Sequence, residues 1–391
     1  MYDFHAWRRL LHGRKLPTAL LLSLAVTPFA ATPLHAESPE SGVACCQALD
    51  LHARTTLDSL MPGLLDKQVI FVGETHDRYE HHLAQLEIIR RIHQAYPDLV
   101  IAMELFAQPN QVHLDDYVAS RSDEATMLRL AGYFHGNRLD YRLYRPILQF
   151  ARDHAIPVLA LNIPREISHK VALHGLAALT GDERKWIPAE IDRGNENYRQ
   201  RVQESFRQHP QGMNFDFDNF LEAQLLWDEA MAARAADYLK QHPGRHMVVL
   251  AGMGHLFYGD GIPSRLTRRA PTSMAIVLNN PGDMLSPDIA DVVLFPSPQD
   301  LPANGKLGVA FSEQDGLIKV DSLEPDSAAG AAGILAGDYL IAVAGQALTS
   351  SDELRLAILD KLPGDTVRVT VRRPGSPFAP EREQEIPVTL R

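Results

Sequence analysis

The distribution of apolar residues along the chain predicts a mostly parallel β-sheet flanked by helices. Six short runs are apolar at nearly every position, which is typical of strands that are buried on both faces. Stretches with helical periodicity, such as 79–96 and 220–242, lie between these runs. Alternation of strands and helices favours an α/β fold with a parallel sheet. The six predicted strands are 69–72, 99–103, 157–161, 247–250, 274–278 and 291–295.

The pattern changes again in the second half of the chain. Residues 181–219 are polar and rich in Arg, Asn and Gln, which predicts a helical insertion. From residue 306 onward, short alternating strands, tight turns and one helix at 351–362 indicate a small β-rich domain. We therefore predict a large α/β domain at 47–298, a Pro-containing linker at 299–305 and a second domain at 306–391.

The first 36 residues have the pattern of an export signal. Arg8, Arg9, Arg14 and Lys15 precede the apolar stretch 16–31, and Pro28 interrupts that stretch. A spanning helix of about 20 apolar residues is therefore disfavoured, and a small-residue cleavage site follows at Ala36. The sequence predicts an exported protein of the periplasm or outer-membrane periphery, with an uncleaved anchor as the alternative.

Composition and cysteine usage exclude several other classes of protein. A length of 391 residues fits two domains, and a net charge of -11 gives no support for nucleic-acid binding. Cys45 and Cys46 are the two cysteines of the chain, and they are adjacent. Neighbouring cysteines do not form an ordinary disulfide, and their spacing matches neither a zinc site nor a covalent haem attachment.

Polar side chains follow four of the predicted strands directly. Because ligands of open parallel sheets bind outside the carboxyl ends of the strands, these polar groups are expected to converge. A cluster of carboxylates and imidazoles suits metal binding or proton transfer. Each group alone is also explained as a buried polar side chain with hydrogen-bond partners. The predicted cluster contains Glu74, His76, Glu104 and His255, and Asn162 and Arg165 follow the third strand.

The region from residue 306 resembles a PDZ domain of the bacterial type along nearly its whole length. The order of 307–311, 325–329 and the Gly-Asp turn at 337–338 carries this resemblance. It implies that a peptide adds a strand beside 308–311 and that its terminal carboxylate meets the backbone amides of Leu307, Gly308 and Val309. Leu354 and Ile358, one helical turn apart, would line the side-chain pocket or pack in the core. The implied partner is a C-terminal peptide or an envelope protein.

Five motifs of the large domain, in this order, resemble the ChaN-like haem-binding proteins of bacterial envelopes over roughly residues 57–296. The resemblance implies iron-regulated, non-covalent haem binding, with a homodimer as one arrangement of the protomers. The motifs are Gly73-Glu74-Thr75-His76, Ala102-Met103-Glu104-Leu105, Ala160-Leu161-Asn162-Ile163-Pro164, the run from Ala223 to Glu229 with Met231-Ala232, and Gly252-Met253-Gly254-His255.

Haem binding would require an axial ligand such as His or Tyr and an apolar slot for the macrocycle. Under this resemblance the candidate ligands are Tyr198 and His209 in the insertion, and Tyr133 and His135 before it. Arg165 is a further candidate for contact with the cofactor. Each of these residues is also explained as a surface or capping side chain.

A more distant resemblance links the chain to the TraB and TIKI group and to the erythromycin esterases. It implies a hydrolase in which Glu74 or Glu104 is the base, and His76 and His255 bind a divalent metal or act as acid and base. No H-E-x-x-H helix or G-x-S-x-G elbow supports a standard zinc protease or serine hydrolase. The leading prediction is an exported haem-binding protein; a metallohydrolase and a non-enzymatic scaffold are the alternatives.

Overall fold

A computed structural model describes residues 55–135, 139–207, 216–375 and 380–391. The predicted export signal and both cysteines lie outside these residues, as does His209. Within the described ranges, no helix is both long enough and apolar enough to span a membrane.

The first domain contains a six-stranded sheet in the order β3-β2-β4-β1-β5-β6, and every adjacent pair of strands is parallel. The sequence-based α/β prediction is therefore confirmed. All six predicted strands are present, and several extend into the polar residues that follow them. Their bounds are β1 Val69–Glu74, β2 Leu99–Ala107, β3 Val158–Asn162, β4 His246–Gly252, β5 Met274–Asn279 and β6 Val292–Leu294.

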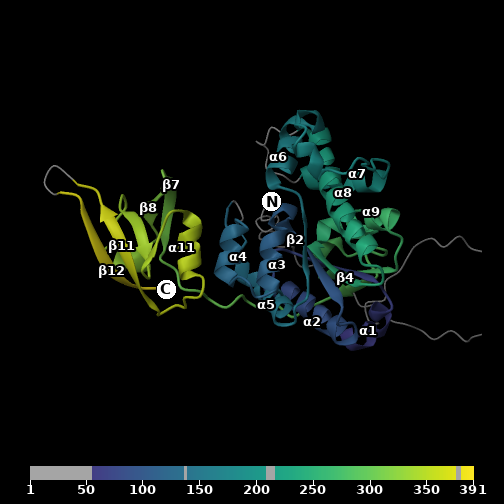
Figure 1. Ribbon diagram of the computed structural model, residues 1–391, viewed down its shortest axis with the longest axis horizontal. Helices are drawn as coiled ribbons and strands as arrows, with labels where there is room; N and C mark the ends of the chain where they lie inside the picture. Colours follow the sequence, from purple (N-terminus) through teal and green to yellow (C-terminus); the bar gives the residue numbers. More distant parts are fainter. Residues whose placement is uncertain (1–54, 136–138, 208–215, 376–379) are drawn as a thin grey trace, which may run out of the picture.

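Helices cover both faces of this sheet, which explains why its strands are continuously apolar. Successive residues of β1 enter opposite cores: Ile70 and Val72 pack with one set of helices, and Val69 and Phe71 with the other. Figure 1 shows the two layers on either side of the strands. The first layer includes α1 Leu57–Leu65, α2 Tyr79–Ala95, α3 Gln111–Val118, α4 Glu124–Leu130 and α5 Arg145–Asp153; the second is built on α8 Phe217–Gln241 and α9 Ile262–Arg269.

Two helices pack on α8: α6, which precedes the polar stretch 181–219 predicted as an insertion, and α7, which lies within that stretch. The helix α6, Arg165–His174, buries Ile167 and Val171 against α8. The helix α7, Glu196–Arg207, is polar on most of its surface but buries Tyr198 against Leu221 and Leu225 of α8. The insertion is thus attached to the long helix that covers one face of the sheet.

The second domain contains an antiparallel sheet in the order β12-β11-β9-β8-β7, with the short strand β10 paired to β9. Its core contains Ile318, Val320, Leu340 and Val369. The strand β7 lies at the edge of the sheet, so one of its sides pairs with no other described strand. The elements are β7 Val309–Gln314, β8 Leu317–Leu323, α10 Ala328–Ala331, β9 Tyr339–Val343, β10 Gln346–Ala347, α11 Ser351–Ile358, β11 Thr366–Arg373 and β12 Arg382–Thr389.

The helix α11 is four residues shorter than the predicted 351–362. Pro363 follows Leu362 and disfavours helical backbone at that residue. The amide of Leu362 instead donates a hydrogen bond to the Asp365 carboxylate at 2.8 Å, within a turn. The helix therefore ends at Ile358.

The two domains contact each other through α11 and α4, which lie side by side in Figure 1. Arg129 of α4 donates two hydrogen bonds to the Glu353 carboxylate, at 2.7 and 3.3 Å. Arg355 donates to the Phe134 carbonyl at 2.9 Å and lies over the Phe134 ring. One helix thus packs in the second domain's core and also contributes an ion pair and a hydrogen bond to the first domain.

Candidate functional site at the carboxyl edge of the sheet

The first part of the site is an arm of three side chains at the end of β1. The Glu74 carboxylate is buried and lies 2.5 Å from Nδ1 of His76. Tyr144, which immediately precedes α5, donates its hydroxyl to the same carboxylate oxygen at 3.3 Å. The arm therefore has the order tyrosine, carboxylate, imidazole.

The helix α2 holds the turn that presents His76. His82 Nε2 lies 3.1 Å from the His76 carbonyl oxygen, and His82 Nδ1 lies 3.1 Å from the Gln85 side chain. Gln85 in turn donates to the Val72 carbonyl of β1 at 3.0 Å. These buried contacts fix the turn after β1 to the helix that follows it, which restricts the orientation of His76.

The second part of the site repeats the same order of groups with residues from other elements. His255 lies in η6, Met253–His255, directly after β4, and its Nδ1 is 2.5 Å from an oxygen of Asp228. Tyr198 donates its hydroxyl to the other Asp228 oxygen at 2.7 Å. Asp228 comes from the middle of α8 and is completely buried.

Glu104 lies between the two arms. Its Oε1 is 3.5 Å from Nε2 of His255, and its Oε2 accepts a hydrogen bond from the Gly252 amide at 2.8 Å. A Cβ on Gly252 would lie 3.3 Å from His76 Nε2 and 3.6 Å from Glu104 Oε2. The His76 imidazole and the Glu104 carboxylate therefore both lie next to the backbone of Gly252. The predicted convergence of the four strand-end residues is what the structure shows.

The space enclosed by the cluster is small. A cavity of about 10 Å³ is lined in part by Glu74, His76, Glu104 and Tyr144. This volume accommodates about one water molecule. One carboxylate oxygen of Glu74 is buried there without a hydrogen-bond partner among the described residues. A porphyrin does not fit inside this cavity, so a haem would have to bind elsewhere on the domain.

Mutual attraction keeps the groups of the cluster ionised. Burial alone would lower the pKa of His76, but the Glu74 carboxylate and then Glu104 raise it to about 9. Burial would raise the pKa of Glu104, yet His255, His76 and the Gly252 amide lower it to about 2. Burial opposes protonation of His255 too, but Glu104 and Asp228 raise its pKa well above the usual value. At neutral pH the cluster thus pairs two imidazoliums with carboxylates.

These charges should make the stability of the domain depend on pH in two directions. The pKa of His76 is about 9 when folded and 6.5 ordinarily, so its contribution is complete below pH 6.5 and lost towards pH 9. The pKa of Glu104 is about 2 when folded and 4.5 ordinarily, so its contribution is complete above pH 4.5 and lost towards pH 2. We expect the free energy of unfolding to fall by roughly 2–3 kcal/mol between pH 6.5 and 9.

Urea unfolding at several pH values would check this expectation. In the His76→Asn variant the alkaline decrease should become shallower, and the remaining decrease should come from His255. The exposed His154 serves as the control, because its replacement by Asn should leave the slope unchanged. An alkaline slope that is equal in wild type and His76→Asn would contradict the assignment.

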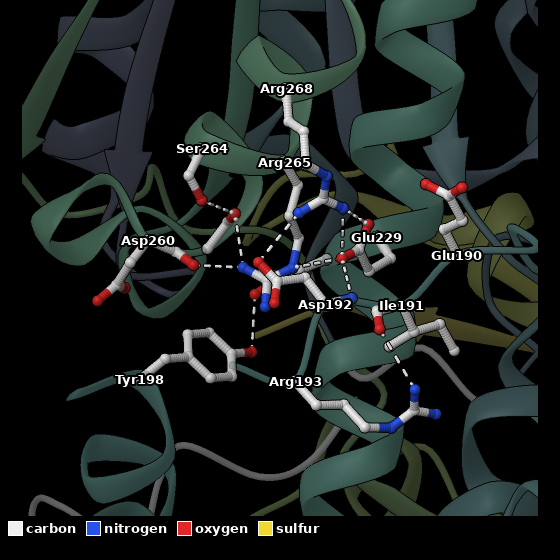
Figure 2. A network of polar contacts seen from close by, with 12 residues as sticks. Glu190, Ile191, Asp192, Arg193, Tyr198, Glu229, Asp260, Ser264, Arg265 and Arg268 are labelled. Carbon is white, nitrogen blue, oxygen red and sulfur yellow. Dashed lines mark hydrogen bonds and ion pairs between the residues drawn. The ribbon is translucent and has the colours of Figure 1, made fainter. Parts of the chain in front are cut away.

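A second buried charge network supports the Asp228 arm. Glu229, the next residue of α8, is completely buried and pairs with Arg265 at 3.2 Å and with Arg268 at 2.9 Å. Figure 2 shows Arg265 between Glu229 and Asp260. The Arg265 guanidinium also lies over the Tyr198 ring, with its carbon 4.8 Å from the ring centroid. The network connects α7, α8 and α9 around the residues that hold His255.

The structure places the predicted haem ligands apart from one another. Tyr198 and Tyr133 are buried, and their hydroxyls donate to Asp228 and to the Leu139 carbonyl. Both rings lie inside the domain. His135 is exposed on the side that faces α11, and Arg165 is exposed at the start of α6. His209 lies outside the described residues.

The predicted metal ligands and peptide-binding residues have equally definite positions. In the part of the chain that the structure describes, no group of three or more His, Cys, Asp or Glu side chains is arranged to hold a metal ion. Leu307 is buried, and Gly308 has a φ of 69°, which turns the chain into β7. Leu354 is buried in the domain core, and Ile358 is half-buried at its boundary.

Sequence reasoning missed the residues that complete the two arms. Asp228 stands in the motif from Ala223 to Glu229 but received no role there; it is an acid within a largely apolar helical stretch, and burial of that helix was the signal available for it. Tyr144 follows no predicted strand, so the strand-end rule could not find it. Tyr198 was one of four candidate haem ligands, and the structure places its buried hydroxyl in the Asp228 arm.

Comparisons with known proteins agree with this architecture. A family model described as haem-binding uptake, Tiki superfamily, ChaN matches residues 60–266, and a PDZ domain model matches residues 305–381. The solved structure "Cofacial heme binding to ChaN of Campylobacter jejuni" has a TM-score of 0.50 and 19% identity, and the match covers 64% of this chain and 96% of that chain. At this identity the likeness shows a shared fold.

Two further matches are more limited. Protein RETICULATA-RELATED 5, chloroplastic, of Arabidopsis thaliana is 24% identical over 235 residues, which are 56% of this chain. This chain spans about a third (32%) of the length of that curated relative. A mutant of the erythromycin esterase EreC, in its open conformation, matches 57% of this chain and 72% of its own at 14% identity with a TM-score of 0.36, too low to support an argument. The family model covers more than half of the sequence, and this chain therefore belongs to the ChaN-like haem-binding family and carries a PDZ domain after its ChaN-like domain.

Proposed function

We propose that this chain is an exported haem-binding protein of the bacterial envelope that serves haem or iron acquisition. Family membership supports haem as the ligand, and the sequence pattern of residues 1–36 supports export. The observation that carries the proposal is an exposed apolar surface at the carboxyl edge of the sheet. Haem needs such a surface because most of the macrocycle is apolar.

This surface, which we call the haem edge, consists of Tyr258, Met284 and Phe295. These residues lie in segments that follow β4, β5 and β6, and 40%, 37% and 65% of their surfaces are exposed. Among the described residues of the ChaN-like domain, Val112 and Leu130 are the other large apolar side chains with comparable exposure. Three of the five such side chains therefore lie in segments that follow strands of the half of the sheet from β4 to β6.

The carboxylate–imidazole cluster does not favour the hydrolase alternative. A general base works best when its pKa is near the working pH. Here the pKa of His76 is raised to about 9 and that of Glu104 is lowered to about 2, so neither is poised to accept a proton at neutral pH. The cluster is better suited to hold the loops after β1 and β4 in place beside the haem edge.

The PDZ domain, in this proposal, recruits a peptide or a partner protein of the envelope. One side of its edge strand β7 pairs with no other strand of the described residues, and a peptide can add there as a further strand. The amide of Ser351 donates to the Glu313 carboxylate at 2.9 Å, which connects β7 with the start of α11. These two elements would form the walls of the peptide site, and α11 would keep that site next to the ChaN-like domain.

A haemin titration of the chain from Glu37 onward tests the proposal. We expect a saturable shift of the Soret band at about one haem per chain, with little transition metal in the same sample. Size-exclusion chromatography with and without haem would show whether two protomers share the ligand. Absence of a saturable shift, together with stoichiometric bound metal, would contradict haem binding and favour the metallohydrolase.

Variants of the haem edge locate the binding surface. The double change Met284→Ser and Phe295→Ser should weaken haem binding by about tenfold or more, because burial of one such side chain contributes roughly 1.5–3 kcal/mol. Val112, which is exposed on α3 in the same domain, provides the matched control as Val112→Ser. Equal affinity of the double variant and wild type would place the haem on another surface.

A further inference from the structure

The strand β3 lies at one edge of the parallel sheet, and side chains rather than a further described strand cover its outer side. Gln108 donates its side-chain amide to the Leu161 carbonyl at 2.9 Å. Gln111 donates to the Val158 carbonyl at 2.7 Å and accepts a hydrogen bond from the Ala160 amide at 2.9 Å. The two glutamines thus satisfy backbone groups of the kind that an uncovered edge strand would expose.

A cavity of about 240 Å³ lies beside this covered edge, between α3 and the end of α8. Its volume is more than twenty times that of the 10 Å³ cavity in the carboxylate–imidazole cluster. Sites for drug-sized molecules measure about 300–1,000 Å³, so this cavity suits a somewhat smaller molecule. It borders Val158, the first residue of β3, and therefore lies at the amino edge of the sheet.

The wall of the cavity that α8 contributes is fixed by contacts with neighbouring segments. The rings of Tyr238 and His242 are stacked, with centroids 4.2 Å apart and an interplanar angle of 22°. The Tyr238 hydroxyl accepts a hydrogen bond from Arg245 at 2.6 Å, and Arg245 also pairs with Asp98 at 2.5 Å. A ligand would therefore meet a flat wall that is already formed, as is usual for small-molecule sites.

The guanidinium of Arg234, which also lines the cavity, makes little use of its hydrogen-bonding capacity. Its Nε is buried without a hydrogen-bond partner among the described residues, and its Nη2 lies 3.5 Å from the Gln111 side-chain oxygen. Asp115 lines the same cavity but accepts from Gln111 at 2.9 Å, and no acidic side chain of the described residues pairs with Arg234. Buried polar groups normally have partners, and the fork of a guanidinium matches a carboxylate.

We propose that this cavity, which we call the α3–α8 site, binds a small amino carboxylate of the size of an amino acid. Arg234 would pair with the carboxylate of the ligand through two parallel hydrogen bonds. Asp115, which is exposed at the rim, would pair with its ammonium group and disfavour a compact anion such as phosphate. The stacked rings of Tyr238 and His242 would contact the remainder of the ligand. The site lies at the edge of the sheet opposite to the haem edge, so the inference does not depend on haem binding.

Calorimetry of the chain from Glu37 onward tests the inference, with each common L-amino acid and with succinate and inorganic phosphate as comparisons. At least one amino acid should raise the melting temperature and bind about tenfold or more tightly than succinate or phosphate. Arg234→Gln should weaken this binding by about tenfold or more, and Arg234→Lys, which keeps the charge but loses the fork, should cause a smaller loss. Lys240→Gln is the matched control, because Lys240 is exposed on the same helix and does not line the cavity.

The outcomes distinguish a specific site from an unoccupied cavity. Asp115→Asn should remove the preference for the amino acid over succinate, and this change at the exposed rim tests the site even if Arg234→Gln fails to fold. Equal binding of amino acids and succinate by wild type would overturn the amino carboxylate as ligand. Absence of binding by every amino acid, or undiminished binding in a folded Arg234→Gln, would overturn the site. The haem affinity of Arg234→Gln should match wild type, so a failure of haem binding and a failure of this inference are separable.

Discussion

The Glu229→Gln variant should lose about 3–5 kcal/mol of its free energy of unfolding, since removal of one partner from a buried ion pair leaves the other charge uncompensated. Glu229 is completely buried and pairs with Arg265, Arg268 and Arg269. It also accepts the Asp192 amide at 2.8 Å. Glutamine keeps the shape of the side chain but removes the negative charge, and only 2% of the surface of Arg265 is exposed to solvent.

Urea unfolding followed by circular dichroism would measure this loss. The matched control is Glu222→Gln on the same helix, where the carboxylate pairs with Arg193 near the surface. Surface pairs contribute at most about 1 kcal/mol, so the control should be almost as stable as wild type. Equal and small effects of the two substitutions would mean that the three arginines are compensated by other groups.

The consequence of Glu229→Gln should extend to the site, because Glu229 and Asp228 are adjacent in α8. Asp228 orients His255, and Tyr198 contacts both Asp228 and the Arg265 guanidinium. Arg265 belongs to α9, which follows the segment that carries Tyr258 and Asp260. A loss of this charge network would therefore loosen the haem edge at the same time as it destabilises the fold.

The strands could be predicted from the sequence, while the connections between them could not. Runs such as 69–72 and 247–250 are apolar because both faces of each strand are covered, so composition alone reveals them. The strand-end rule then brought Glu74, His76, Glu104 and His255 together, since parallel strands end at one edge. Neither the strands nor the convergence of these four residues depends on knowing how the helices pack on the sheet.

Residues that reach the site from helices were not predictable in the same way. Tyr144 and Asp228 depend on how α5 and α8 pack on the sheet, and this packing is set by contacts between residues far apart in the chain. The burial of Tyr198 was not predictable either, because α7 is polar on most of its surface and Tyr198 is the one residue that it buries. Tyr258 received no attention, since a left-handed turn after Gly252-Met253-Gly254-His255 has no apolar periodicity that would indicate it.

Among glycine-to-alanine substitutions near the site, Gly261→Ala should cause the largest loss of folding stability. A Cβ at this position would overlap the carbonyl oxygen of His255 and lie 2.7 Å from its carbonyl carbon. It would also lie 3.1 Å from an Asp228 carboxylate oxygen. Because the obstructing atoms belong to the backbone rather than to a flexible side chain, the segment 255–261 must move as a whole. We expect a loss of about 3 kcal/mol or more, at the upper end of the cost of overpacking.

Differential scanning calorimetry and haemin titration of Gly261→Ala would measure the two effects of this movement. The melting temperature should fall, and haem affinity should fall further than stability alone explains, because Tyr258 lies in the displaced segment. Gly63→Ala is the control: nothing lies within 4 Å of its Cβ, and the residue is inside the helix α1. Alanine in a helix is favoured over glycine by roughly 0.5–1 kcal/mol, so this control should be as stable as wild type or slightly more stable. Suppose that Gly261→Ala had the same melting temperature as Gly63→Ala and bound haem with wild-type affinity. The close packing of His255, Asp228 and Tyr258 would then not determine the position of the haem edge.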